Sequence, residues 1–442
     1  GMDESLLEQQ SGTPSASHGG AQDDSAKLSV SIRWPIFACM FYFLSAALTT
    51  PAMPSFINQL VNDDGSMRVT ERGVDLKGTF DSIDQLFTFF FDPIWGTVSD
   101  RVGRRPLQVL SCVGYTFGWA TVACASPLWL LFAGRALDGT TSCMLPICQS
   151  SVKDISAPEA LARNLGTLQG VAIGMAFLIG GSAGGALVQF ESPRLNFAIA
   201  SSVAAFAAVV LALFSPETLR PEDRAQRVEW KRANPLSTLV RLGKSRMSLA
   251  ASTSFLLFWF GLNGLQVNLY NYTAYRYGWA PSVALGLQAA SGLVLAASNA
   301  LGPGYLGSLV GEMNVVRIGL VGFAASLAGM AVSQTGWAFA ASVIAGSVAT
   351  VCLPGLTGLV AAQADKDDVG ATLAALDSMS TLDRFVAYKV MSRLFAWGIA
   401  HGQVGTHFYA GAGCALLGWV AFEVALCTAP RTRRGVAPEV CA

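Results

Sequence analysis

Charged side chains stand inside long apolar stretches of this sequence, where they could carry protons or bind ions. Arg135 and Asp138 are three positions apart, so they share one face of a helix. Two further carboxylates, Asp84 and Asp92, lie in another apolar stretch. A carboxylate in an apolar environment binds a proton more readily than one in water. We therefore predict that these four residues couple proton movement to the function of the protein.

A second charged group lies in the otherwise apolar segment 370–399, which contains Asp377, Asp383, Arg384, Lys389 and Arg393. Each ion in a bilayer costs at least about 2.5–3.5 kcal/mol, so these side chains must face protein, water or a solute. Three explanations stay open. The ions line a cavity and bind a charged solute, they form salt bridges with the acids of residues 78–98, or the segment results from mis-splicing or mistranslation.

If the cavity explanation holds, helical spacing decides which ions face the cavity. Arg384 and Asp377 are seven positions apart and therefore share a face. We assign Arg384, Asp377 and Asp383 to the cavity as candidate solute-binding residues. Lys389 lies on a different face from Arg384, and we predict that it points toward a neighbouring helix.

The sequence GTVSDRVGRRP forms a short basic loop between apolar segments 78–98 and 106–125. Gly103 permits a tight turn, and Pro106 suits the first turn of a following helix. Asp100 stands at the membrane edge, where a carboxylate needs an arginine or a helix N-terminus as partner. An ordinary cytoplasmic loop needs only Lys and Arg, so this order of residues indicates a specific role for Gly96, Asp100, Arg101, Gly103, Arg104 and Arg105.

The composition shows which elements position these residues. Hydrophobic residues make up 52% of the 442 positions and charged residues 13%, against about 25% in an average soluble protein, and the mean hydropathy is +0.45. This excludes a soluble enzyme, a nucleic-acid-binding protein and a disordered scaffold. The net charge is zero, and the nine cysteines form no CxxC pair, so neither a polyanion partner nor a metal or disulfide framework is indicated.

Twelve segments are long and apolar enough to cross a membrane as helices. They cover 33–56, 78–98, 106–125, 128–151, 164–190, 195–214, 248–274, 282–307, 315–333, 336–361, 370–399 and 406–428. The sequence therefore predicts an all-α membrane protein. Polar tails are expected at 1–32 and 429–442.

Lysine and arginine residues are distributed unevenly between the two sets of loops. With both termini inside, 20 of these residues lie in interior segments and five in exterior loops. The positive-inside rule therefore predicts that both termini are cytoplasmic. The longest interior loop, 215–247, separates six spans (33–214) from six more (248–428), which is the layout of a secondary transporter built from two bundles.

Segment 164–190 contains glycines at intervals of four, which would allow another helix to approach closely. We predict packing roles for Gly170, Gly174, Gly181 and Gly185.

These motifs resemble those of the major facilitator superfamily, in the branch of the tetracycline-resistance and hippocampus-abundant-transcript-like transporters. The loop at 96–105 resembles the signature G-x-x-x-D-R-x-G-R-R. Arg135 and Gly139 resemble the R-x-x-x-G motif, and Pro216-Glu217-Thr218 resembles the PE[ST] that closes the sixth span. The resemblance implies twelve helices in two six-helix bundles. It further implies that Asp100 meets the N-terminus of the eleventh span, that Arg104 pairs with Asp154, and that Arg135 takes part in proton coupling.

We therefore expect a proton-coupled secondary transporter that moves a small solute by alternating access. An uncoupled facilitator and a transport-inactive receptor or scaffold remain alternatives, because the antiporter motif reads Gly180-Gly181-Ser-Ala-Gly184-Gly185 and lacks its proline. No ATP-binding loop G-x-x-x-x-G-K-[ST] is present. The expected partners are a solute, a proton or another coupling ion, and the lipid bilayer. We expect a monomer with no cofactor, no metal, no nucleic acid and no enzymatic activity.

Overall fold

The computed structural model describes residues 31–190, 192–227, 242–243, 245–364 and 369–428. Within these ranges the chain forms helices and no strand. Most of the predicted tail 1–32, all of the tail 429–442 and the middle of the predicted linker 215–247 lie outside the described residues.

The first half of the chain forms nine helices, with a π-helical turn at Leu168–Ile173. They are α1 (Arg33–Thr49), α2 (Ala52–Val61), α3 (Glu71–Val102), α4 (Arg104–Cys124), α5 (Leu128–Thr141), α6 (Met144–Ile155), α7 (Pro158–Thr167), α8 (Gly174–Phe190) and α9 (Pro193–Phe214). After a short 3₁₀ turn at Pro221–Asp223, the described residues of the second half form seven helices. They are α11 (Arg246–Tyr277), α12 (Pro281–Val310), α13 (Glu312–Val332), α14 (Gly336–Ala349), α15 (Cys352–Ala362), α16 (Val369–Ala400) and α17 (Thr406–Thr428).

These helices account for the twelve predicted spans. Eight described spans are long and apolar enough to cross a membrane, and the pair α1–α2, bent by 41°, makes a ninth. The remaining three are α3, α5 with α6, and α16. They contain the charged residues that the sequence singled out, which is why composition alone does not select them.

Of the predicted boundaries, the start of the second span differs most from the structure. Helix α3 begins at Glu71 rather than at 78, because the Thr70 hydroxyl accepts a hydrogen bond from the Gly73 backbone N–H and caps the helix about two turns earlier. Arg72 and Lys77 therefore stand on a helix and not in a loop.

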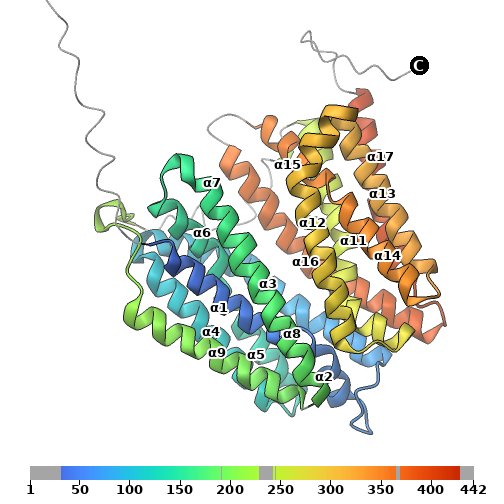
Figure 1. Cartoon of the computed structure of the whole chain (residues 1–442), viewed down its shortest axis with the longest axis horizontal. Coiled ribbons are helices and arrows are strands. Elements are labelled where there is room, and N and C mark those ends of the chain that lie inside the picture. Colours follow the sequence, from blue (N-terminus) through green and yellow to red (C-terminus); the bar gives the residue numbers. More distant parts are fainter. Residues whose placement is uncertain (1–30, 191, 228–241, 244, 365–368, 429–442) are drawn as a thin grey trace, which may run out of the picture.

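The two halves lie side by side, coloured blue to green and yellow to red in Figure 1. Each half has its own apolar core. One is built from residues between Ala38 and Leu211, the other mainly from residues between Leu242 and Phe422. Val74 at the start of α3 is an exception, because it is fully buried in the core of the second half. Helix α3 therefore contacts both halves.

Helix α1 begins and helix α17 ends at one end of the molecule, and the two halves contact each other at the opposite end. We call this the far end and the opposite one the terminal end. At the far end, the Asn58 side-chain amide of α2 donates to Asn271 of α11 at 3.3 Å. Helix α8 also contacts α12 there, where a Cβ on Gly181 would lie 2.6 Å from Leu285. At the terminal end, a Cβ would meet no atom within 4 Å at Gly166, Gly170, Gly174, Gly304, Gly358 and Gly370.

Candidate functional site

Arg135 on α5 is the centre of a buried ionic cluster in the first half. Its guanidinium donates to Asp84 of α3 at 3.0 Å and to Asp138 of α5 at 2.5 Å. The side chains are 16%, 10% and 4% exposed, respectively. The rings of Phe80 and Trp119 lie 5.1 and 5.7 Å from the guanidinium carbon and stabilise its charge further. The structure thus brings together three of the four residues predicted to couple protons.

A polar connection leads from this cluster to the second half. Gln85, next to Asp84, donates its amide N–H to that carboxylate at 2.6 Å. The Gln85 carbonyl oxygen accepts from Arg384 of α16 at 3.4 Å. Arg384 is only partly buried and faces α3, which is the surface between the halves where the sequence analysis placed it.

Helices α3 and α16 run antiparallel, and their pairing fixes the remaining ions. Lys389 donates to Asp75 at 2.8 Å and to Thr79 at 2.6 Å. The predicted contact of Lys389 with a neighbouring helix is confirmed. The contact is a salt bridge, but its acid, Asp75, precedes the residues 78–98 that the salt-bridge explanation considered. Asp92 is seven residues after Gln85, and Asp377 is seven residues before Arg384. Because the two helices run antiparallel, Asp92 lies level with Asp377, and their charges interact.

Asp383 lies on another side of α16. It accepts a hydrogen bond from Asn263 of α11 at 3.1 Å, so its observed partner belongs to the same half. Asp377, by contrast, is exposed. Two of the three residues assigned to the cavity, Arg384 and Asp377, therefore lie on the side of α16 that faces α3, in line with their spacing of seven, whereas Asp383 points toward α11.

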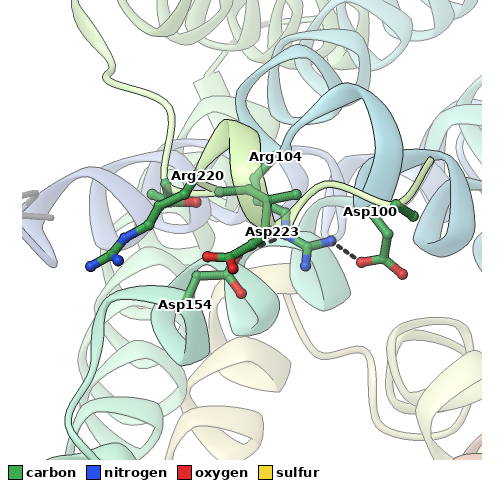
Figure 2. Close-up of a pocket in the computed structure, with 8 residues that line it drawn as sticks. Asp100, Arg104, Asp154, Arg220 and Asp223 are labelled. Carbon is green, nitrogen blue, oxygen red and sulfur yellow. Dashed lines mark hydrogen bonds and ion pairs between the residues drawn. The ribbon is translucent and has the colours of Figure 1, made fainter. Parts of the chain in front are cut away.

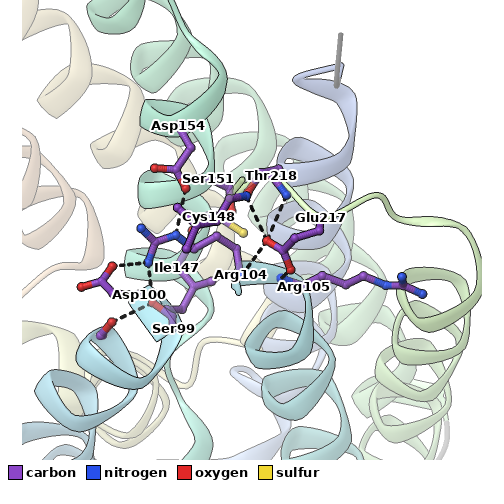
Figure 3. A network of polar contacts seen from close by, with 12 residues as sticks. Ser99, Asp100, Arg104, Arg105, Ile147, Cys148, Ser151, Asp154, Glu217 and Thr218 are labelled. Atoms are coloured by element: carbon purple, nitrogen blue, oxygen red, sulfur yellow. Dashed lines mark hydrogen bonds and ion pairs between the residues drawn. The ribbon is translucent and has the colours of Figure 1, made fainter. Parts of the chain in front are cut away.

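The signature loop between α3 and α4 contains a second ionic cluster (Figure 3). Arg104 donates to Asp154 of α6 at 2.9 Å and to Asp100 at 2.6 Å. Gly103 has a φ of +114°, which a residue with a side chain rarely adopts. The structure brings Arg104 and Asp154 together as the resemblance implies.

Other residues of the loop are placed differently from the expectation. In this structure Asp100 pairs with Arg104, and among the described residues it has no hydrogen bond or ion pair with α16. Arg101 is exposed, and a Cβ on Gly96 would meet nothing within 4 Å. The expected contact of Asp100 with the eleventh span is thus not formed while the terminal end is open.

Glu217 is a residue of this cluster to which the sequence analysis gave no role. Its carboxylate accepts from the backbone N–H groups of Arg104 at 2.8 Å and Arg105 at 3.1 Å, and from those of Thr218 and Leu219 at 3.0 Å each. It therefore caps the N-terminus of α4 with a negative charge. The Pro-Glu-Thr motif pointed to Glu217, but the sequence could not show that it caps α4, which begins more than 100 residues earlier.

Arg105 makes the reciprocal contact. Its guanidinium donates to the backbone carbonyls of Leu211, at 3.2 Å, and Ala212 in the last turn of α9. Each helix end therefore receives a side chain of the charge that suits its dipole. The Ala225 N–H also donates to the Asp100 carbonyl at 2.9 Å. These contacts fix the first residues of the linker to the signature loop.

A pocket of about 380 Å³ lies between the signature loop and the start of the linker. Figure 2 shows Asp100, Arg104, Asp154, Arg220 and Asp223 at its wall. The wall combines both charges and comes from α3, α4, α6 and the linker. It is therefore a joint between these segments.

The four predicted packing glycines divide into two pairs. A Cβ on Gly181 would lie 2.6 Å from Leu285, and a Cβ on Gly185 would lie 3.5 Å from Ser282, so both glycines lie against α12. At Gly170 and Gly174, by contrast, a Cβ would meet nothing within 4 Å, so no helix packs on these two positions in this structure. They lie toward the terminal end, where the halves are apart.

The architecture and the loop geometry can be compared with known proteins. A sequence profile described as Major Facilitator Superfamily matches residues 36–388. The chain belongs to the major facilitator superfamily. The tetracycline-resistance branch suggested by the motifs is also supported. The class E tetracycline resistance protein of Escherichia coli is 24% identical over 371 residues, which cover 82% of this chain and 88% of that protein.

Further relatives agree with this placement in the superfamily. Major facilitator superfamily domain-containing protein 10 of Bos taurus is 31% identical over 151 residues, covering 34% of this chain and 32% of that protein. The crystal structure of the human organic anion transporter MFSD10 (TETRAN) has a TM-score of 0.65 at 20% identity, covering 88% and 98% of the two chains. The nucleoside transporter NupG gives 0.70 at 14%, covering 89% and 99%. The predicted fold of twelve helices in two bundles is confirmed, and the chain is a multi-pass membrane transporter.

Proposed function

We propose that this transporter moves a small solute by alternating access and couples this movement to protons. The observation that carries the proposal is the Asp84–Arg135–Asp138 cluster. Two carboxylates share one guanidinium in a site removed from water, so the cluster as a whole carries an excess negative charge. Burial disfavours that charge, and binding of one proton removes it.

The connection from Asp84 through Gln85 to Arg384 supports coupling between the cluster and the movement of the halves. Protonation of Asp84 would weaken its attraction for Arg135 and its acceptance of the Gln85 N–H. Gln85 in turn holds Arg384 across the surface between the halves. A change of charge in the first half can therefore alter a contact between the two halves.

Alternating access is supported by the contrast between the two ends. The halves are joined at the far end and apart at the terminal end, so the site between them opens toward the terminal side. With both termini cytoplasmic, this is the inward-open state.

The orientation in the membrane is testable with Gln226→Cys, an exposed position in the linker. In intact cells with the protein at the plasma membrane, membrane-impermeant maleimide should leave it unlabelled until the membrane is permeabilised.

The coupling is tested in proteoliposomes that contain the full-length protein, using a panel of labelled solutes with and without a pH gradient. A gradient should drive accumulation by the native protein. Asp84→Asn and Asp138→Asn should abolish accumulation but retain exchange of solute at equal concentrations, because exchange needs no net proton movement. Glu423→Gln removes a carboxylate paired with Arg317 in α13, far from the cluster, and should leave coupling intact.

Two results would contradict the proposal. Solute flux that is indifferent to the gradient would identify an uncoupled facilitator. Absence of flux for the whole panel, from folded protein, would favour a receptor or scaffold.

A further inference from the structure

Asn263 and Asp383, between α11 and α16, form a polar site whose hydrogen bonding is incomplete. Asn263 is fully buried and donates its amide N–H to Asp383. Its carbonyl oxygen has no hydrogen-bond partner among the described residues. A carboxylate can only accept, so the amide orientation is fixed and the Asn263 oxygen remains an open acceptor. A buried acceptor without a partner is unfavourable, so the site calls for a hydrogen-bond donor.

Trp259 stands one turn before Asn263 on the same face of α11. Its indole N–H also lacks a partner among the described residues. This side of α11 therefore carries two buried polar groups whose hydrogen bonding is incomplete.

The charges around this site favour the same kind of ligand. Toward the middle of α3, α5 and α16 lie five carboxylates, at Asp84, Asp92, Asp138, Asp377 and Asp383, and three guanidinium groups, at Arg135, Arg384 and the exposed Arg393. Arg135 is already engaged by two carboxylates, and the hydrogen-bond partner of Arg384 is the uncharged Gln85. The two lysines nearest the far end are each paired with an aspartate of α3. Negative charge is therefore in excess, and an anionic solute would be repelled.

We propose that Asp383 and Asn263 bind the protonated amine of the transported solute, which makes organic amines the substrate class. The carboxylate supplies the countercharge, and the free amide oxygen accepts a second N–H. A primary or secondary ammonium satisfies both acceptors, whereas a quaternary ammonium satisfies only the charge. That the bound amine is transported rests on the proposed function, whereas the assignment of the binding site does not.

Binding is measured directly on the full-length protein in lipid nanodiscs, by equilibrium dialysis of three fluorescent probes with the same aromatic body. They are 2-(1-naphthyl)ethylamine, its N,N,N-trimethyl derivative and 1-naphthylacetate. We expect the amine to bind at least about tenfold more tightly than the acetate, with the quaternary compound between them. Equal or tighter binding of the acetate would overturn the proposal.

Two substitutions separate the two interactions. Asp383→Asn should weaken binding of the amine by about 10- to 100-fold. Asn263→Leu should weaken the amine but leave the quaternary probe within about threefold. Asp383→Glu keeps the charge and should retain part of the affinity. Glu423→Gln, the matched loss of a carboxylate elsewhere in the second half, should bind all three probes as the native protein does.

The outcomes separate this proposal from the previous one. If Asp383→Asn binds the amine as tightly as the native protein, the assignment fails even where transport is observed. If the amine binds through Asp383 but no solute is moved, the site stands and transport fails. If Asp383→Asn does not fold, the order of affinities for the three probes and the effect of Asn263→Leu on amine binding still test the proposal.

Discussion

Gly78 provides a direct test of the closed far end. It lies where α3 crosses α16 most closely, and a Cβ there would come within 2.7 Å of the Tyr388 carbonyl oxygen and would also contact the Ser392 side chain. Real Cβ atoms essentially never approach another heavy atom closer than 3.0 Å. Since the obstacle includes backbone, Gly78→Val requires the two helices to move apart.

The expected size follows from the cost of overpacking, which is about 1–3 kcal/mol. That cost applies only to the state in which the far end is closed. The equilibrium should therefore shift about 5- to 150-fold toward the state that is open at the far end and closed at the terminal end.

The assay is alkylation of a cysteine placed at Gly170, which faces open space at the terminal end in this structure. Its labelling by maleimide should be fast in the native background and slower when Gly78→Val is added, by at most that factor, because the rate follows the fraction of molecules that are open at the terminal end. Gly413→Val is the matched control, because a Cβ at that exposed position of α17 meets nothing within 4 Å.

An unchanged labelling rate in folded, monodisperse Gly78→Val protein would refute this reasoning. It would mean that the contact between α3 and α16 at Gly78 exists in both states. A similar slowing by Gly413→Val would show that the effect comes from valine in a helix and not from the crossing.

Three further predictions concern other contacts. Glu217→Gln should lower the free energy of unfolding by about 1–2 kcal/mol, because the α4 cap loses its charge and one acceptor. Thermal unfolding in detergent checks this, and the exposed Glu222→Gln should unfold at the same temperature as the native protein. His407→Phe should raise the unfolding temperature, since the imidazole is 1% exposed among aromatic rings and neither nitrogen has a partner among the described residues; a lower temperature would reveal a hidden polar role. A double-mutant cycle of Lys389→Met and Asp75→Asn, read by the same alkylation assay, should give a coupling of only about 0.2–1 kcal/mol, because the pair is one-third exposed.

Much of the architecture could be predicted because it depends on local properties. A helix that crosses a bilayer must satisfy its own backbone, so apolar length and flanking charge are sufficient to locate most spans. The start of α3 could not be located in this way, because its first two turns are charged and only one side of them, at Val74, packs on the second half. Val74 in the core of that half shows that the segment needed a partner distant in sequence.

The candidate site was predictable as a set of residue types but not as a set of contacts. Helical spacing correctly joined Arg135 to Asp138 and separated Lys389 from Arg384. It could not show that Asp84 from another helix completes the first cluster, or that Asp383 faces α11. Nor could it show that Glu217 caps a helix whose first residue is 113 positions earlier.

The sequence by itself therefore determined that this chain crosses a membrane many times and which residues had to find partners there. Both follow from the cost of placing charge in hydrocarbon, which depends on residue type and position in a span. The tertiary structure decided which partners they found and which end of the molecule is closed. Those outcomes depend on the crossing of α3 with α16 and of α8 with α12, where contacts at Gly78 and Gly181 form between segments that the sequence holds about 100 or more residues apart.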